Sequence, residues 1–163
     1  MTHAVVPPGL TLRFEPAPSL ETRQALGDRI RAFNARHAPG EAERFALLLQ
    51  DDDAALRAGL VGVLFGGWLF VESLWVDDAL RGQGIGRALM ASAEDHARTQ
   101  GCHDAWLDTF QARGFYEQIG YVTFAVLEDY PPGQSRHFLR KTLREQQAAD
   151  VPDEMPPGST KRG

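Results

Sequence analysis

The chain has 163 residues, of which 43% are apolar and 24% charged, and its formal net charge is −5 at pH 7. This length favours a single domain, and the acidic balance without a long basic run excludes nucleic acid as an expected partner. The apolar run at residues 58–71 holds four glycines and is shorter than the roughly 20 residues that span a bilayer. Since the start shows no leader pattern and only one cysteine is present, we expect a cytoplasmic protein that binds no membrane.

The first predicted elements are a strand and a helix. Apolar and polar residues alternate over Leu10–Glu15, which predicts a strand. Ser19 is a typical helix cap, and the expected helix carries apolar residues at i, i+4 and i+7: Leu26, Ile30 and Phe33. Three further strands are expected: Arg44–Leu49, Leu56–Phe65 and Leu69–Val76. The last is apolar on both faces except at Glu72 and Ser73, which predicts a central position in a sheet.

The second half of the chain predicts two helices and three strands: Ile85–Gln100, Gln111–Ile119, Ala105–Thr109, Tyr121–Glu128 and Arg136–Leu143. Residues 146–163 are polar and rich in proline and glycine, so we expect a disordered tail after a domain formed by residues 1–145. The order β-α-β-β-β-α-β-α-β-β predicts an α/β (α+β) fold, with a mixed sheet of seven strands and helices on both faces.

A glycine-rich segment joins the central strand to the longer helix. Gly82, Gly84 and Gly86 alternate with other residues directly before the helical pattern. A helix N-terminus carries unpaired N–H groups and about half a positive charge. Glycines allow a phosphate group to approach those N–H groups closely. The segment therefore predicts a binding site for a phosphorylated cofactor.

Two common phosphate-binding loops do not match this segment. A Walker loop ends in Gly-Lys-Ser/Thr, whereas Gly86 is followed by Arg87 and Ala88. A dinucleotide-binding fingerprint needs a glycine or alanine where this chain has Arg87 or Leu89, and it follows the first strand of its fold rather than the fourth.

A third loop does match. The hexapeptide RGQGIG at Arg81–Gly86 resembles the Arg/Gln-x-x-Gly-x-Gly/Ala signature of the GNAT superfamily of acyl-CoA N-acyltransferases. GFYEQIGY at Gly114–Tyr121 resembles the helix that follows the fifth strand in that superfamily. FQARGFYEQIGY at Phe110–Tyr121 and DYPPGQ at Asp129–Gln134 resemble a group of its small bacterial members, in which a proline replaces Arg113. The resemblance covers roughly residues 10–143 and implies a mostly antiparallel GNAT sheet.

The resemblance implies acetyl-CoA as the acyl donor. Its pantetheine arm would pair with the backbone of Leu74, Trp75 and Val76, and the Val76 N–H would polarise the thioester carbonyl. Its pyrophosphate would bind at the loop and the start of the helix: Arg81, Gly82, Gln83, Gly84, Ile85, Gly86 and Arg87. The alternative reading of the loop is a plain tight turn with surface arginines.

Two side chains are candidates for proton transfer. Glu72 is the candidate general base, because an amine acceptor must lose a proton; alternatively it is a solvent-facing residue or an ion-pair partner. The resemblance assigns Tyr116 as the general acid that protonates the leaving thiolate, and the alternative is an aromatic residue packed on the sheet beside Phe115. Cys102 is poorly placed as an acyl carrier, so we expect direct attack in a ternary complex.

The acceptor site is expected to involve Phe33, Asn34, Trp68 and Asp108. Asp108 and Thr109 end a strand beside the expected cleft, where they either contact the acceptor or cap the next helix. The five histidines and Cys102 show no metal-ligand spacing, so no metal is expected.

These inferences predict an N-acetyltransferase that moves an acetyl group from acetyl-CoA to a primary amine of a small molecule or peptide. A non-catalytic acyl-CoA-binding sensor or interaction module is the first alternative, since it needs neither Glu72 nor Tyr116. An unrelated nucleotide-binding domain is the second. A homodimer is also expected, because small GNAT proteins often pair through their C-terminal strands.

Overall fold

The computed structural model describes residues 6–36 and 40–144. The chain divides into two compact units, residues 1–40 and 41–163. The predicted tail at residues 146–163 lies outside the described residues. Within the described part of the chain, no helix is long and apolar enough to cross a membrane.

The first unit contains the predicted helix but not the predicted strand. Helix α1 spans Leu20–Asn34, and the Ser19 hydroxyl accepts a hydrogen bond from the Thr22 N–H at 3.0 Å, as expected for a cap. Residues 10–15 form no strand, so that prediction is wrong. A strand exists through hydrogen bonds to a neighbouring strand, and an alternating sequence defines two faces without supplying that neighbour. The sheet accordingly has six strands instead of seven.

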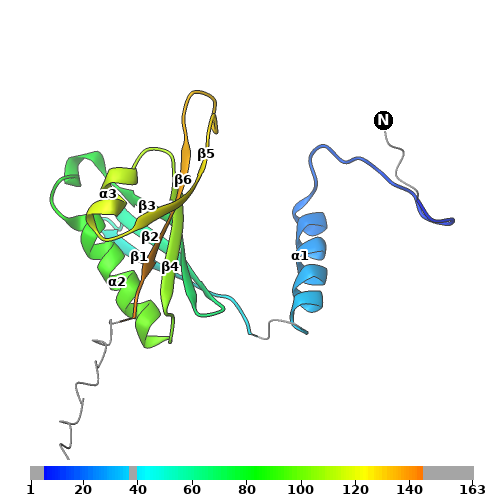
Figure 1. The fold of residues 1–163 in the computed structure, drawn as a ribbon, viewed down its shortest axis with the longest axis horizontal. Helices are drawn as coiled ribbons and strands as arrows, with labels where there is room; N and C mark the ends of the chain where they lie inside the picture. Colours follow the sequence, from blue (N-terminus) through cyan, green and yellow to red (C-terminus); the bar gives the residue numbers. More distant parts are fainter. Residues whose placement is uncertain (1–5, 37–39, 145–163) are drawn as a thin grey trace, which may run out of the picture. The chain divides into compact units, whose positions relative to one another are not determined.

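The second unit is built on this sheet (Figure 1). Its strands are β1 Glu43–Gln50, β2 Leu56–Phe65, β3 Trp68–Val76, β4 Asp104–Thr109, β5 Val122–Leu127 and β6 Arg136–Thr142. They lie in the order β1-β2-β3-β4-β6-β5, and every neighbouring pair is antiparallel except β3 and β4, which are parallel. The helical elements are the 3₁₀ turn η1 Asp78–Leu80, α2 Ile85–Thr99 and α3 Arg113–Gln118. The structure thus confirms the expected mixed, mostly antiparallel sheet with helices.

The core lies between the sheet and the two helices α2 and α3, which Figure 1 shows on the same side of the sheet. Strand β2 alternates buried and half-buried residues, as a strand with one covered face must. The small residues Ala93 and Ala97 of α2 are fully buried and allow a close approach to the sheet. One hydrophobic cluster joins α2, α3 and the strands, so the covered face is a single core.

The parallel pair β3 and β4 separates partway along its length. The two strands are in register only from Trp68 opposite Asp104 to Phe70 opposite Trp106. Beyond that point Glu72 is an extra residue in β3, because Val61 lies opposite Ser73 while the next residue of β2 lies opposite Val71. A bulge of this kind bends its strand. The second half of β3 therefore has a ladder on its β2 side and none on the side facing β4.

Candidate functional site

A cavity of about 740 Å³ lies at the open end of β3, between the glycine loop and α3. Its lining residues are Leu74, Trp75, Val76, Leu80, Arg81, Gly82, Gly84, Ile85, Gly86, Arg87, Gln111, Ala112, Phe115, Tyr116 and Gln118. They include nine of the ten residues predicted to bind the cofactor, together with the predicted acid Tyr116. Gln83 is the exception, since its side-chain amide donates to the Ala79 carbonyl at 3.1 Å and is not part of the lining.

The N-terminus of α2 forms one wall of this cavity. Gly84 precedes the helix with a φ of +82°, a left-handed conformation that favours glycine, and no side chain among the described residues caps the helix there. The first helical hydrogen bond runs from the Ala88 N–H to the Gly84 carbonyl at 3.0 Å. The N–H groups of the first turn therefore lack helical acceptors. Arg87 adds a positive charge at the positive end of the helix dipole, so this wall suits an anion.

Ion pairs and backbone hydrogen bonds hold the loop in front of α2. The Asp77 carboxylate accepts the Ala79 N–H at 2.9 Å and pairs with Arg57 of β2 at 3.1 Å. Arg81 donates from Nε to the Val76 carbonyl at 3.2 Å and pairs with Asp78 at 2.7 Å. The loop is thus tied to both β2 and the end of β3, which fixes the helix N-terminus relative to the strand.

Gly86 of α2 lies close to Phe115 of α3. A Cβ atom on Gly86 would lie 3.4 Å from Cζ of Phe115, which is van der Waals contact. Phe115 is one of the lining residues that sequence reasoning did not assign to the site, together with Leu80, Gln111, Ala112 and Gln118. Ala112, Phe115 and Gln118 recur at a spacing of three residues, which places them on the same side of the helix as Tyr116. This helical periodicity could have predicted that they line the site.

Tyr116 is the buried titratable group of the cavity. Its side chain is 7% exposed, and its ring meets those of Phe115 and Tyr121 edge to face at 5.0 and 6.0 Å. Burial, and secondly the nearby Asp108 carboxylate, raise the pKa of Tyr116 above its ordinary value of 10.0. The phenol is therefore protonated at neutral pH and presents an O–H donor.

The backbone of β3 offers a second donor. The Asp77 N–H donates to the Arg57 carbonyl of β2 at 2.9 Å. Backbone groups of successive residues in an antiparallel strand point to alternate sides, so the N–H and carbonyl of Val76 point away from β2. Both groups of Val76 therefore point toward the side of β3 from which β4 has separated. The carbonyl already accepts from Arg81, which leaves the Val76 N–H as the donor on that side.

Glu72 lies on β3 but does not line the cavity. Its side chain is 42% exposed, and its carboxylate accepts a hydrogen bond from Nε of Arg44 on β1 at 3.0 Å. The sequence left two alternatives to a general base for Glu72, a solvent-facing residue and an ion-pair partner. In the structure Glu72 is both.

Asp108 and Thr109 have different partners in the structure. The Thr109 hydroxyl accepts the N–H groups of Gln111 and Ala112 at 3.3 and 3.1 Å, in the turn that precedes the first residue of α3, Arg113. Asp108 instead pairs with Arg136 of β6, whose Nε donates to Oδ2 at 2.5 Å. Thr109 thus closes the turn before α3, whose N-cap position is Ala112, and the Asp108 carboxylate lies at the end of β4.

Of the other residues predicted to contact the acceptor, Trp68 lies away from the cavity, and Phe33 and Asn34 belong to the first unit. Trp68 begins β3, about 26 Å along an extended strand of nine residues from the Val76 end, and its ring contacts that of His103. Phe33 and Asn34 end α1 in the first unit, where the guanidinium of Arg36 lies over the Phe33 ring. The structure therefore does not bring Trp68 to the cavity of the second unit.

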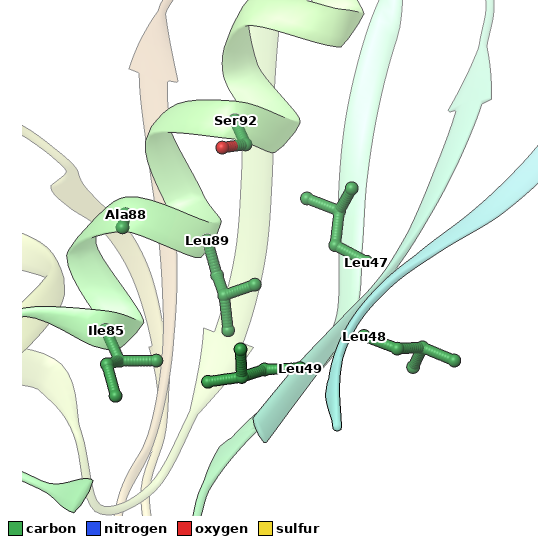
Figure 2. Close-up of a pocket in the computed structure, with 7 residues that line it drawn as sticks. All are labelled: Leu47, Leu48, Leu49, Ile85, Ala88, Leu89 and Ser92. Atoms are coloured by element: carbon green, nitrogen blue, oxygen red, sulfur yellow. The ribbon is translucent and has the colours of Figure 1, made fainter. Parts of the chain in front are cut away.

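A second hollow, of about 390 Å³, lies between β1 and the first turns of α2. Figure 2 shows Leu49 and Leu89 pointing toward each other across it. Its lining carries no ionisable group, so it has no acid, base or ion ligand to offer. Among the described residues, no group of three or more His, Cys, Asp and Glu is placed to hold a metal ion.

Comparisons with known proteins agree with this arrangement. Residues 11–121 match the model of the acetyltransferase (GNAT) family. An acetyltransferase of Agrobacterium fabrum is 37% identical over 124 residues, which cover 74% of this chain and 90% of that protein. Blasticidin-S acetyltransferase of Streptomyces morookaense is 43% identical over 104 residues, 62% of this chain and 76% of that one.

A solved structure extends the likeness to the fold. The crystal structure of an acetyltransferase from Bacillus cereus superposes with a TM-score of 0.70 at 26% identity, over 80% of this chain and 97% of that one. The glycine loop, the open end of β3 and the helix bearing Tyr116 all lie within the second unit and within the matched family region. The chain belongs to the acetyltransferase (GNAT) family.

Proposed function

We propose that the protein transfers an acetyl group from acetyl-CoA to a primary amine of a small molecule or peptide. The observation that carries the proposal is one cavity that joins an uncapped helix N-terminus to a buried, protonated tyrosine. The first feature suits a pyrophosphate, and the second suits a leaving thiolate that needs a proton.

The donor would lie along the open edge of β3. The N–H groups at the start of α2 would bind the pyrophosphate, with Arg81 and Arg87 adding charge. The backbone of Leu74–Val76 would pair with the pantetheine arm as a neighbouring strand would, since this edge has no ladder to β4. The Val76 N–H would then polarise the thioester carbonyl.

The chemistry follows from these placements. The amine nitrogen attacks the thioester carbon, the carbon–sulfur bond breaks, and the sulfur takes the proton of the Tyr116 hydroxyl. Burial raises the pKa of the Cys102 thiol, and the nearby Glu43 adds to this effect. Cys102 is also absent from the cavity lining, which supports direct attack without an acyl-cysteine intermediate.

The base that takes the amine proton is proposed to be Glu72, acting through water because its carboxylate is exposed and outside the cavity lining. Asp108 is proposed to face the acceptor. Relatives support a small-molecule amine as the acceptor class: one is blasticidin-S acetyltransferase, and a rice protein, 30% identical over 125 residues, is glucosamine 6-phosphate N-acetyltransferase.

The test is release of CoA thiol from acetyl-CoA over a panel of polyamines, aminoglycosides, aryl amines, amino acids and peptide N-termini. The proposal expects release that depends on one class of amine and falls in Tyr116→Phe. Tight binding of acetyl-CoA without release to any amine would instead indicate an acyl-CoA sensor. Competition by NAD or ATP, with no effect of CoA, would indicate a nucleotide-binding domain.

A homodimer through β5 is part of the proposal. This strand ends the sheet and exposes apolar side chains: Val122, Phe124, Val126 and Leu127. An uncovered apolar edge strand tends to pair with another chain. Light scattering at micromolar concentration should give twice the chain mass, and a monomer would dismiss this part of the proposal.

A further inference from the structure

Of the titratable clusters of the second unit that lie outside the cavity lining, two contain a largely buried carboxylate. One joins Glu94 of α2 to Lys141 of β6 at 2.6 Å and ties the helix to the sheet. The other joins Asp108, Arg136 and Tyr130 at the end of β4 that leads into α3. The second bears on the reaction, because its Asp108 carboxylate is near enough to the candidate acid Tyr116 to raise the pKa of that phenol.

We infer that Arg136 is a positioning residue of the acceptor side, held between Asp108 and Tyr130 so that it fixes the Asp108 carboxylate and balances its charge. The inference rests on the acetyl transfer proposed above. In this role Arg136 would neutralise the negative charge of Asp108 near the reacting groups.

The ion pair is short and largely shielded from water. Both Nε and one terminal nitrogen of Arg136 lie 2.5 Å from Oδ2 of Asp108, whose side chain is only 16% exposed. Asp108 lies opposite Phe138 in the β4–β6 ladder, so Arg136 reaches it diagonally on the same face of the sheet. A carboxylate this far removed from solvent is costly without its partner.

Tyr130 holds the other side of the guanidinium. The Arg136 guanidinium carbon lies 5.4 Å from the centre of the Tyr130 ring, within the range of a cation–π contact. The loop that carries Tyr130 is itself closed, because the Asp129 carboxylate accepts the Gly133 N–H at 2.7 Å and the Tyr130 N–H donates to the Gln134 carbonyl at 2.9 Å. Arg136 is therefore confined from two directions.

Asp108 is connected to Tyr116 through the backbone of the same turn. Thr109, the residue after Asp108, caps Ala112, and the Ala112 carbonyl accepts the Tyr116 N–H at 3.3 Å. The Asp108 carboxylate also contributes to the raised pKa of Tyr116. An unbalanced charge at Asp108 would raise that pKa further, and it would hold an approaching amine as ammonium, which cannot attack.

The other ionisable groups around Tyr116 do not replace Arg136. Tyr121 packs against the Tyr116 ring and is itself neutral, because burial and the neighbouring Glu94 raise its pKa. Arg81 and Arg87 line the same cavity at the glycine loop, where they face the predicted pyrophosphate. Arg136 is the cation that the structure pairs with Asp108 among the described residues.

The experiment compares Arg136→Gln, Arg136→Lys and Asp108→Asn, with Arg140→Gln as the matched control. Arg140 lies on the same strand, and its removal subtracts the same charge opposite Trp106 instead of Asp108. Two readouts are needed. One is the pH profile of kcat/KM for the amine, with the Kd for acetyl-CoA measured alongside. The other needs no substrate: carbon NMR titration of tyrosines labelled at Cζ, which number only three in this chain.

The inference expects Arg136→Gln to lower kcat/KM for the amine roughly tenfold or more at neutral pH, with the acid limb moved up by about one pH unit. The acetyl-CoA Kd should stay within about twofold of wild type, because the variant spares the glycine loop. The Tyr116 resonance should titrate at higher pH in Arg136→Gln and at lower pH in Asp108→Asn. Arg136→Lys should restore part of both effects, and Arg140→Gln should match wild type.

Equal pH profiles and equal Tyr116 titrations in Arg136→Gln and Arg140→Gln would overturn the inference. A loss of kcat/KM in Arg136→Gln without any shift of either curve would also overturn it, because it would indicate a merely structural role. If wild type acetylates no amine, the proposed function fails, and the NMR titration still decides whether Arg136 balances Asp108 at Tyr116.

Discussion

The proposed donor end of the site lies in the cavity, the proposed acceptor end lies outside the cavity lining, and the two are built from different groups. The end proposed for the donor consists largely of backbone: the N–H groups at the start of α2, the Val76 N–H and the glycine loop. The end proposed for the acceptor consists of side chains in ion pairs, with Asp108 held by Arg136 and Arg136 held by Tyr130. Backbone groups suit a ligand part that never changes, whereas side chains are free to differ with the acceptor. Variants at the two ends should therefore fail in different ways.

The largest effect is expected for Tyr116→Phe. Losing a positioned acid costs about 10²–10⁴-fold in rate, so kcat should fall by that order while the acetyl-CoA Kd changes little. Because burial and Asp108 raise the pKa of Tyr116 above 10.0, the wild-type rate should fall with rising pH only above pH 10. That alkaline limb should disappear in the variant.

Tyr121→Phe is the matched control, because it removes a hydroxyl from a buried ring that packs on Tyr116 and lies outside the cavity lining. Its kcat should stay within several-fold of wild type. Equal losses in both variants would mean that Tyr116 contributes packing and no proton.

Glu72→Gln comes next, with an expected loss of about 10²-fold in turnover at neutral pH if the carboxylate takes the amine proton. Arg44→Gln is its control, because it breaks the same ion pair and leaves the carboxylate in place. Steady-state rates and thermal melts of both variants separate the roles. Unchanged turnover in Glu72→Gln, with similar melts for the two variants, would remove Glu72 from the mechanism.

A variant at the donor end should change the affinity for CoA. Gly84→Ala forces a φ of +82° on a residue with a side chain, at a cost of about 1–3 kcal/mol, and it should move the N–H groups that are proposed to bind the phosphate. We expect the CoA Kd, measured by calorimetry, to rise roughly tenfold or more. A change of this size corresponds to the loss of one charge-assisted hydrogen bond between a backbone N–H group and the phosphate.

Gly101→Ala is the control for this change. Its φ is +80°, and like Gly84 it has open space where a Cβ would stand, but it lies at the other end of α2. The two variants should lose similar stability and differ in CoA affinity. Equal affinities would show that the loop does not bind CoA.

The smallest effect is expected for Arg87→Gln. A cation in the first turn of α2 opposes the helix dipole, so its removal should stabilise the free protein by about 0.3–1 kcal/mol. The same change should weaken CoA binding and reduce its dependence on salt. Chemical denaturation with and without CoA measures both quantities. A free protein that becomes less stable would contradict this account of Arg87.

Local signals in the sequence predicted the glycine loop and the helix that follows it, but not the ion pairs of the proposed acceptor end. The glycine loop is a contiguous segment. The left-handed turn at Gly84 and the uncapped start of α2 both lie within a few residues of it, so a local pattern can indicate them. The pairs Arg44–Glu72 and Asp108–Arg136 each join residues 28 positions apart. Such pairs depend on strand register, which no local pattern encodes.

Two other differences have the same physical origin. The alternating residues 10–15 met the sequence criterion for a strand, but pairing with a neighbour decides whether a strand forms. Trp68 was predicted to contact the acceptor, whereas the parallel pairing of β3 and β4 places it at the end of β3 where the two strands are paired. The bulge at Glu72, which opens the strands, is visible only in the register.

The most direct test of the central claim is mass spectrometry of the amine after reaction with acetyl-CoA, for wild type, Tyr116→Phe and Gly84→Ala. The account predicts that wild type adds one acetyl group to the amine nitrogen and that both variants lose most of this product. The loss should be in kcat for Tyr116→Phe and in the KM for acetyl-CoA for Gly84→Ala. Acetyl-CoA bound by wild type with no acetylated amine, over the whole panel, would contradict the account.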